Sequence, residues 1–83
     1  MGGIIMKRFS LDEYLKNPSK KVVTRLGRTA RIICTDANMK YPIVALIKEY
    51  GTDHVKTYDT NGNVSSVPID IPYSAYDLFF DEE

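Results

Sequence analysis

The stretch Ile43-Val44-Ala45-Leu46-Ile47 consists of five consecutive apolar residues and is the strongest candidate for a buried segment in the chain. A short continuous apolar run of this kind is typical of a strand inside a sheet. Pro42 precedes it, which fits the start of a strand because a missing N–H is tolerated there. We therefore predict a central strand that is covered, at least in part, on both faces.

Two β-branched segments lie on the N-terminal side of this strand. They cover residues 21–25 and 29–35, and a short turn containing Gly27 separates them. Two strand-like segments joined by a tight glycine turn predict a β-hairpin. Because side chains alternate along a strand, one face of the second segment should point to the core, and it comprises Ala30, Ile32 and Cys34.

Further strand signals lie on the C-terminal side. Residues 54–58 alternate, with Val55 and Thr57 on one face. Asn61-Gly62 is the best hairpin signal in the sequence, because both residue types tolerate positive φ angles, and it predicts a returning strand over residues 63–67. Residues 76–80 are too apolar to form a free tail.

The N-terminal part contains one helix signal. Ser10 and Glu13 have the spacing of a capping box, and Phe9 and Tyr14 have the spacing of a hydrophobic staple. Asn17-Pro18 ends the helix, because the residue before proline avoids helical geometry. A helix of about two turns is too short to be stable alone, so it must dock its apolar face, which consists of Leu11, Tyr14 and Leu15.

These elements predict an α+β fold: a short N-terminal helix on a five-stranded antiparallel β-meander that curls into a bent sheet or a small barrel. We expect a single small domain over residues 1–83, with flexible ends at 1–8 and 81–83. The residues predicted to be buried are Ile32, Cys34, Ile43, Ala45, Ile47 and Val55, with Leu11 and Leu15 packed on them.

The composition is that of an ordinary globular protein. The 83 residues include 43% hydrophobic and 27% charged side chains, and the formal net charge is zero. No apolar run approaches the roughly 20 residues of a membrane-spanning helix, and Met1–Arg8 is too short for a signal peptide. A single cysteine and a single histidine argue against a disulfide scaffold and the common zinc sites. We therefore expect a cytoplasmic protein without membrane contact, metal or cofactor.

The charges are unevenly distributed along the chain. Residues 1–31 hold eight basic and two acidic side chains, whereas residues 32–83 hold three basic and nine acidic ones. A basic patch on the predicted first hairpin could contact phosphates, and its candidate residues are Lys20, Lys21, Arg25, Arg28 and Arg31. The alternative is that the acidic half neutralises the hairpin within the fold. The basic strand lacks the interleaved aromatic residues that single-stranded nucleic acids use for stacking.

The tyrosines indicate a different kind of surface. Five of them lie at or near predicted strand ends and loops, and tyrosine is enriched in protein interfaces. The candidate interface residues are Tyr41, Tyr50, Tyr58, Tyr73 and Tyr76. Several of them could instead close the ends of the sheet.

A catalytic pair is a weaker candidate. Cys34 and His54 could serve as a nucleophile and its base. Cys34 lies between Ile33 and Thr35 on the predicted apolar face of its strand, however, where a free cysteine usually acts as a small hydrophobic residue. We therefore predict no catalytic residues.

Several segments together resemble a group of small proteins from gut Bacteroidetes and their phages or mobile elements that has no established activity. The resemblance covers residues 9–47 and, more loosely, 73–80. It is most specific between Thr24 and Ile47, where it includes Arg31-Ile32-Ile33-Cys34-Thr35-Asp36 and Tyr41-Pro42-Ile43. Leu26 stands where such proteins often have an acidic residue. The resemblance implies an intracellular origin and no catalytic residues.

The sequence therefore favours a non-enzymatic intracellular protein-interaction module. The alternative is a nucleic-acid-binding accessory protein of a phage or mobile element, and a hydrolase is a distant third. Neither the partner nor the oligomeric state follows from the sequence.

Overall fold

The computed structural model describes residues 6–65 and 75–81 of the chain. Within them lie one helix and six strands: β1 (Met6–Arg8), α1 (Leu11–Lys16), β2 (Val22–Thr24), β3 (Ala30–Cys34), β4 (Ile43–Glu49), β5 (Thr52–Tyr58) and β6 (Leu78–Asp81). No helix among the described residues is long and apolar enough to cross a membrane. The fold is thus mostly β, and the predicted α+β class is wrong.

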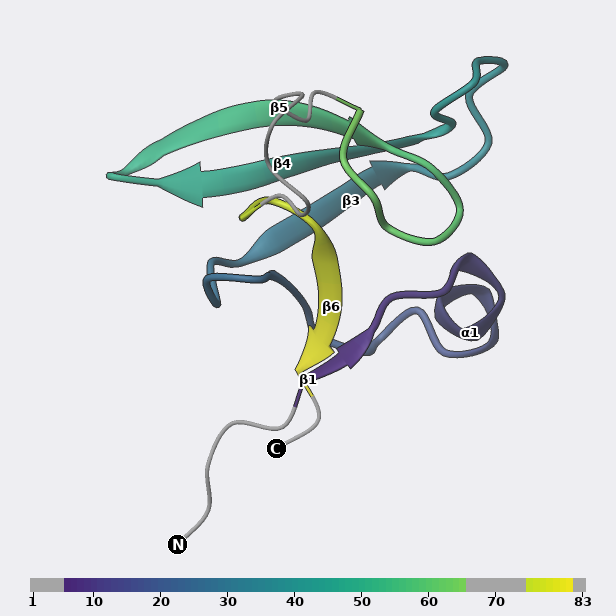
Figure 1. Cartoon of the computed structure of the whole chain (residues 1–83), viewed down its shortest axis with the longest axis horizontal. Helices are drawn as coiled ribbons and strands as arrows, with labels where there is room; N and C mark the ends of the chain where they lie inside the picture. Colours follow the sequence, from purple (N-terminus) through teal and green to yellow (C-terminus); the bar gives the residue numbers. More distant parts are fainter. Residues whose placement is uncertain (1–5, 66–74, 82–83) are drawn as a thin grey trace, which may run out of the picture.

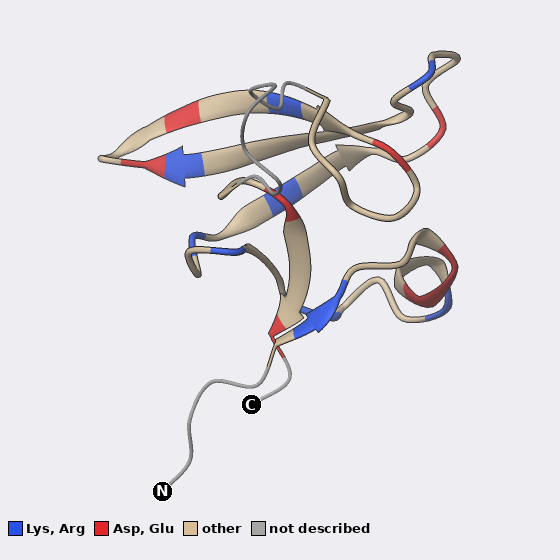
Figure 2. Cartoon of the chain, in the orientation of Figure 1, with Lys and Arg blue, Asp and Glu red and all other residues tan. Residues whose placement is uncertain are grey.

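The strands form two separate three-stranded antiparallel sheets (Figure 1), with the orders β1-β6-β2 and β3-β4-β5. Neither a single five-stranded meander nor a closed barrel is present in the described parts of the chain, so these predictions are also wrong. The pairing includes Met6–Arg8 and Asp81, which we had assigned to flexible ends. Figure 2 shows that acidic and basic residues are interspersed over both sheets.

The predicted hairpin between residues 21–25 and 29–35 is replaced by a branch point between the sheets. A turn does form there, in which Gly27 has a φ of 83° and its N–H donates to the Thr24 carbonyl. Beyond it the strands share only the isolated bridge between Val23 and Thr29. β2 pairs instead with β6, which follows more than 50 residues later, and a local sequence pattern carries no information about such a distant partner.

A tight hairpin joins β4 and β5. Glu49 and Thr52 are the last paired residues, so the loop consists only of Tyr50 and Gly51. Their φ angles are 54° and 77°, and positive φ at both positions is typical of a type I′ turn, which suits the twist of the strands.

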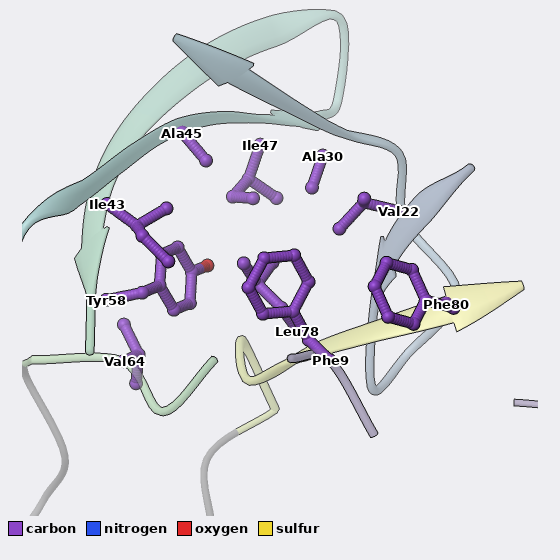
Figure 3. Packing of buried hydrophobic residues seen from close by; sticks show 10 residues of the cluster. All are labelled: Phe9, Val22, Ala30, Ile43, Ala45, Ile47, Tyr58, Val64, Leu78 and Phe80. Atoms are coloured by element: carbon purple, nitrogen blue, oxygen red, sulfur yellow. The ribbon is translucent and has the colours of Figure 1, made fainter. Parts of the chain in front are cut away.

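The core lies between the two sheets (Figure 3). Ile43, Ala45 and Ile47 of β4 are completely buried, as predicted, and face Leu78 and Phe80 of the other sheet. The remaining members of the cluster come from several elements and include Phe9, Val22, Ala30, Tyr58 and Val64. The prediction that Val55 is buried is wrong: it is 66% exposed, because the register places it opposite Leu46 on the other face of the sheet.

The helix docks differently from our expectation. Ser10 occupies the N-cap position but its side chain makes no capping hydrogen bond, and Glu13 instead pairs with Lys7 (2.8 Å) and Lys20 (3.3 Å). The predicted staple is present, since the rings of Phe9 and Tyr14 lie 5.9 Å apart. Leu11 and Tyr14 pack partly on the core. Leu15, predicted to pack there, is exposed.

The connection after β5 places a glycine directly against the core. Asp59 Oδ1 accepts hydrogen bonds from the backbone N–H groups of Asn61 and Asn63, both at 2.9 Å. Gly62 has a φ of 82°, and a Cβ atom there would lie 2.8 Å from Cβ of Phe9. The Asn61-Gly62 turn is therefore present, but within a longer loop that ends at the bridge between Tyr58 and Val64. Residues 66 and 67 of the predicted returning strand lie outside the described residues.

Candidate protein-interaction surface

One face of the sheet β3-β4-β5 points away from the core and carries apolar side chains. We call it the outer face and define it by Ile33, Val44, Leu46 and Val55. Side chains alternate along β4, so the burial of Ile43, Ala45 and Ile47 on the inner side places Val44 and Leu46 on the outer side. Leu46 is paired with Val55 on one neighbouring strand and with Arg31 on the other. Val44 and Leu46 are partly buried, so the outer face of β4 is covered only in part, whereas the inner face is covered completely.

A β-bulge adds Ile33 to the outer face. The register shifts between Ile32, which is opposite Ala45, and Cys34, which is opposite Val44. Two residues of β3 therefore correspond to one step along β4, which bends the strand locally. As a result Ile33 is 53% exposed, and Cys34, predicted to be buried in the core, is only partly buried.

The bulge also separates the two residues considered as a catalytic pair. Cys34 is aligned with Val44 on the outer side, whereas His54 is opposite Ile47 and therefore on the inner side. The two residues also belong to strands on opposite sides of β4. The Cys34 thiol donates a hydrogen bond to Asp36 Oδ1, at 3.4 Å. This arrangement does not bring His54 to the thiol as its base.

Two predicted interface tyrosines meet at the tip of the β4–β5 hairpin. Tyr50 is 89% exposed, and the Arg28 guanidinium lies 5.1 Å from the centre of its ring. The hydroxyl of Tyr76 donates to Oε1 of Glu49 at 3.1 Å. This hydrogen bond to the carboxylate is the main reason why the pKa of Tyr76 is raised, since it favours the neutral phenol. Lys56 lies 4.5 Å from the centre of the Tyr76 ring.

The other predicted tyrosines do not join this cluster. Tyr41 lies before β4, partly exposed, with the Lys40 ammonium 5.7 Å from its ring centre. Tyr58 is completely buried, and its hydroxyl donates to the Tyr76 carbonyl at 2.8 Å. Tyr58 is therefore a core residue and not an interface residue. Tyr73 lies outside the described residues.

The predicted basic patch is largely paired with acidic residues of the same chain. Its ion pairs join Lys20 to Glu13, Lys21 to Asp81 (3.5 Å), Arg25 to Asp77 (3.3 Å) and Arg28 to Glu49 (3.3 Å). Three of these partners come from the acidic part of the chain. Arg31, the fifth residue of the patch, is exposed on β3. The pairing supports the internal-neutralisation alternative over a free phosphate-binding patch.

Asp77 is the most buried of these acidic partners. Its Oδ1 atom accepts a hydrogen bond from the N–H of Val64 at 3.0 Å, while Oδ2 contacts Arg25. The guanidinium groups of Arg8 and Arg25 lie 4.9 and 4.8 Å from the ring centre of Phe79. Asp77 and Phe79 thus hold these cations by charge and by ring contact, which gives Arg25 a structural role.

The sequence contains a signal for the outer face in the five apolar residues 43–47. Because side chains alternate along a strand, such a run places apolar side chains on both faces of the sheet. A sheet that packs against one other sheet is covered on one face only, so the other face then carries apolar side chains at its surface.

Two further findings bear on the kind of site this chain carries. Among the described residues, no group of three or more His, Cys, Asp or Glu side chains is arranged to hold a metal ion. Comparisons with protein-family models, curated proteins and solved structures found no match to this chain.

Proposed function

We propose that this chain is a non-enzymatic protein-interaction module that binds a protein partner through the outer face of the sheet β3-β4-β5. The observation that carries the proposal is the exposure of Ile33 on β3 and Val55 on β5, with the partly exposed Val44 and Leu46 between them on β4. An antiparallel sheet with one solvated face normally alternates apolar and polar residues, and the outward positions are then polar. Here Ile33, Leu46 and Val55 occupy such outward positions.

The composition of the outer face suits a protein partner better than a nucleic acid. Arg31 and Lys48 lie on the same side of the sheet, and Asp53 is paired with Lys48 in the register. An apolar centre with a few charges at its margin is the usual anatomy of a protein interface. Contiguous exposed apolar patches on small proteins commonly mark such sites.

The experiment uses Val55→Asp, which places a charge on the outer face opposite Leu46. Because Val55 is exposed, the free energy of unfolding should change by less than about 0.5 kcal/mol. Wild-type and variant proteins are used for affinity capture from nuclease-treated and untreated host lysates. A protein captured by the wild type is then identified, purified and titrated against both forms.

We expect the affinity of the purified partner to fall at least about tenfold in Val55→Asp. The matched control is Asp53→Asn, two residues away on the same strand and face, which should change the affinity less than about twofold. Unchanged affinity in Val55→Asp would contradict the proposal. Loss of capture after nuclease treatment would instead favour the nucleic-acid alternative.

A further inference from the structure

A groove lies at the branch point where β2 and β3 separate. Its volume is about 440 Å³, and it is formed by the segment that leads into β2 on one side and by β3 on the other. The apolar part of its lining includes Val22, Ala30 and Ile32. The groove exists because β2 and β3 share only the bridge between Val23 and Thr29 before each joins its own sheet.

Backbone N–H and C=O groups on the edge of β3 that is turned away from β4 point toward this groove. The N–H of Lys48 donates to the Thr29 carbonyl, and Arg31 is paired with Leu46, so the polar backbone groups of Thr29 and Arg31 point to β4. In an antiparallel ladder these directions alternate, which turns the backbone groups of Ala30 and Ile32 to the opposite edge. The bridge between Val23 and Thr29 directs the Ala30 N–H toward the Val22 carbonyl, so the groups of Ile32 are the ones left open to the groove. Beyond the bridge to Val23, no strand in the described parts of the chain pairs with this edge.

The charged residues that line the groove all have the same sign. They are Lys20, Lys21 and Arg31, and no carboxylate is among the lining residues. The Lys21 side chain is 64% exposed and 3.5 Å from Asp81, and an exposed ion pair of this kind is easily exchanged for another one. The groove lining is therefore positive at Arg31, which is exposed on β3, whereas the charges of Lys20 and Lys21 are shared with Glu13 and Asp81 outside the lining.

We propose that the groove binds an extended acidic segment of the partner protein, which pairs with the free edge of β3 as an additional strand. This inference rests on the proposed interaction function and specifies the partner's chemistry. Main-chain hydrogen bonds to an exposed sheet edge supply affinity, and side-chain contacts supply specificity. Alternate side chains of the segment would contact the apolar lining, and its carboxylates would pair with Lys21 and Arg31. An apolar lining beside a strand edge fits a peptide better than a nucleic-acid backbone.

The added strand would also connect the groove to the outer face. A strand beside β3 extends the sheet β3-β4-β5, so every second side chain of the segment would lie next to Arg31 and Ile33 on the outer side. The bridge between Val23 and Thr29 occupies the start of this edge, so the free part covers residues 31–34 and corresponds to about 13 Å of extended chain, at roughly 3.3 Å per residue. A segment of about four residues therefore matches the length of the free edge.

The test titrates the full chain with a synthetic eight-residue peptide in which glutamate and valine alternate, followed by amide NMR. We expect chemical-shift changes at Ala30 and Ile32, and at least tenfold slower hydrogen exchange of the Ile32 amide. A peptide in which lysine replaces glutamate is the control for charge. Equal binding of both peptides, or binding with unchanged exchange at Ile32, would contradict the inference. So would binding of a random single-stranded oligonucleotide in place of the acidic peptide.

Two variants locate the charge effect. Arg31→Glu should weaken binding of the acidic peptide about tenfold. Lys48→Glu changes the net charge equally on the same sheet but outside the groove lining, and should weaken it less than about twofold. Equal effects of the two variants would contradict binding in the groove.

The two proposals can fail separately. If the acidic peptide does not bind while Val55→Asp still abolishes partner binding, the groove inference is wrong and the interaction function stands. If the peptide binds and Val55→Asp has no effect on partner binding, the proposal that the partner binds the outer face is wrong instead.

Discussion

The two faces of β4 differ sharply although their residues are equally apolar. Ile43, Ala45 and Ile47 are completely buried, whereas Val44 and Leu46 are only partly buried. The second sheet supplies Leu78 and Phe80 to the inner face, and no described element covers the outer one in the same way. The apolar run thus contributes to two different surfaces: alternate residues form the core, and the residues between them form a partly exposed surface, through which we propose that a partner binds.

β5 shows this division at Tyr58 and Val55 but not along its whole length. Tyr58 lies on the inner side and is buried, while Val55 lies on the outer side and is exposed. The register with β4 sets both outcomes, because Tyr58 is opposite Ile43 and Val55 is opposite Leu46. His54 also lies on the inner side but is exposed, so the second sheet covers the inner face less completely toward the tip of the hairpin.

The largest expected effect comes from a pair of substitutions in adjacent residues. Ile47→Ala removes a completely buried side chain and should lower the free energy of unfolding by about 2–5 kcal/mol. Leu46→Ala removes a side chain of similar size from the outer face and should cost at most about half as much, because less area leaves water there on folding. Urea denaturation measures both. Equal losses would show that the outer face is covered in solution.

A smaller effect is expected from the buried tyrosine of the inner face at alkaline pH. Burial raises the pKa of Tyr58 above its usual value of 10, and the nearby Asp77 raises it further. The unfolded chain then loses this proton at lower pH than the folded chain does. The contribution of Tyr58 to stability is therefore complete below pH 10 and is lost as the pH rises from there toward the folded pKa, by up to about 1.4 kcal/mol per pH unit.

The measurement compares the stability of the wild type at pH 8 and pH 11 with that of Tyr58→Phe. The variant loses the hydrogen bond to Tyr76 and should be less stable by about 1 kcal/mol at pH 8, but its further loss at pH 11 should be smaller than in the wild type. Tyr41→Phe, at a partly exposed position, is the control and should retain the wild-type alkaline loss. An identical alkaline loss in Tyr58→Phe would contradict the burial of this hydroxyl.

Local signals in the sequence predicted local features of the fold. The helix at Leu11–Lys16, the Phe9–Tyr14 contact and the central strand with its buried Ile43, Ala45 and Ile47 each depend on residues close together in the chain. The placement of β6 between β1 and β2 depends on a partner far along the chain, and no local pattern specifies it. This non-local pairing divides the strands into two sheets.

The surface features were predictable to different extents. The exposed Tyr50 follows from its place at a hairpin turn, whereas Tyr58 and Tyr76 have similar sequence contexts but different burial. The position of the bulge at Ile33 is also not visible in the sequence, because the bulge depends on the register with β4. The groove required the separation of β2 from β3 and so could not be predicted before the sheets were known.

The smallest expected effect concerns Tyr50, at the end of the hairpin that carries both faces. A side chain at φ 54° is strained by about 1 kcal/mol, and asparagine followed by glycine is the favoured pair for a type I′ turn. The contact with Arg28 offsets part of this strain, by roughly 0.5–1 kcal/mol for an exposed site. Tyr50→Asn should therefore raise the free energy of unfolding by a few tenths of a kcal/mol, measured by urea denaturation.

The same variant also tests the place of Tyr50 in the interface. If Tyr50 contacts the partner, Tyr50→Asn should bind the purified partner more weakly while being more stable. A variant that is less stable than the wild type would show that the Arg28 contact outweighs the strain, and unchanged affinity would remove Tyr50 from the interface.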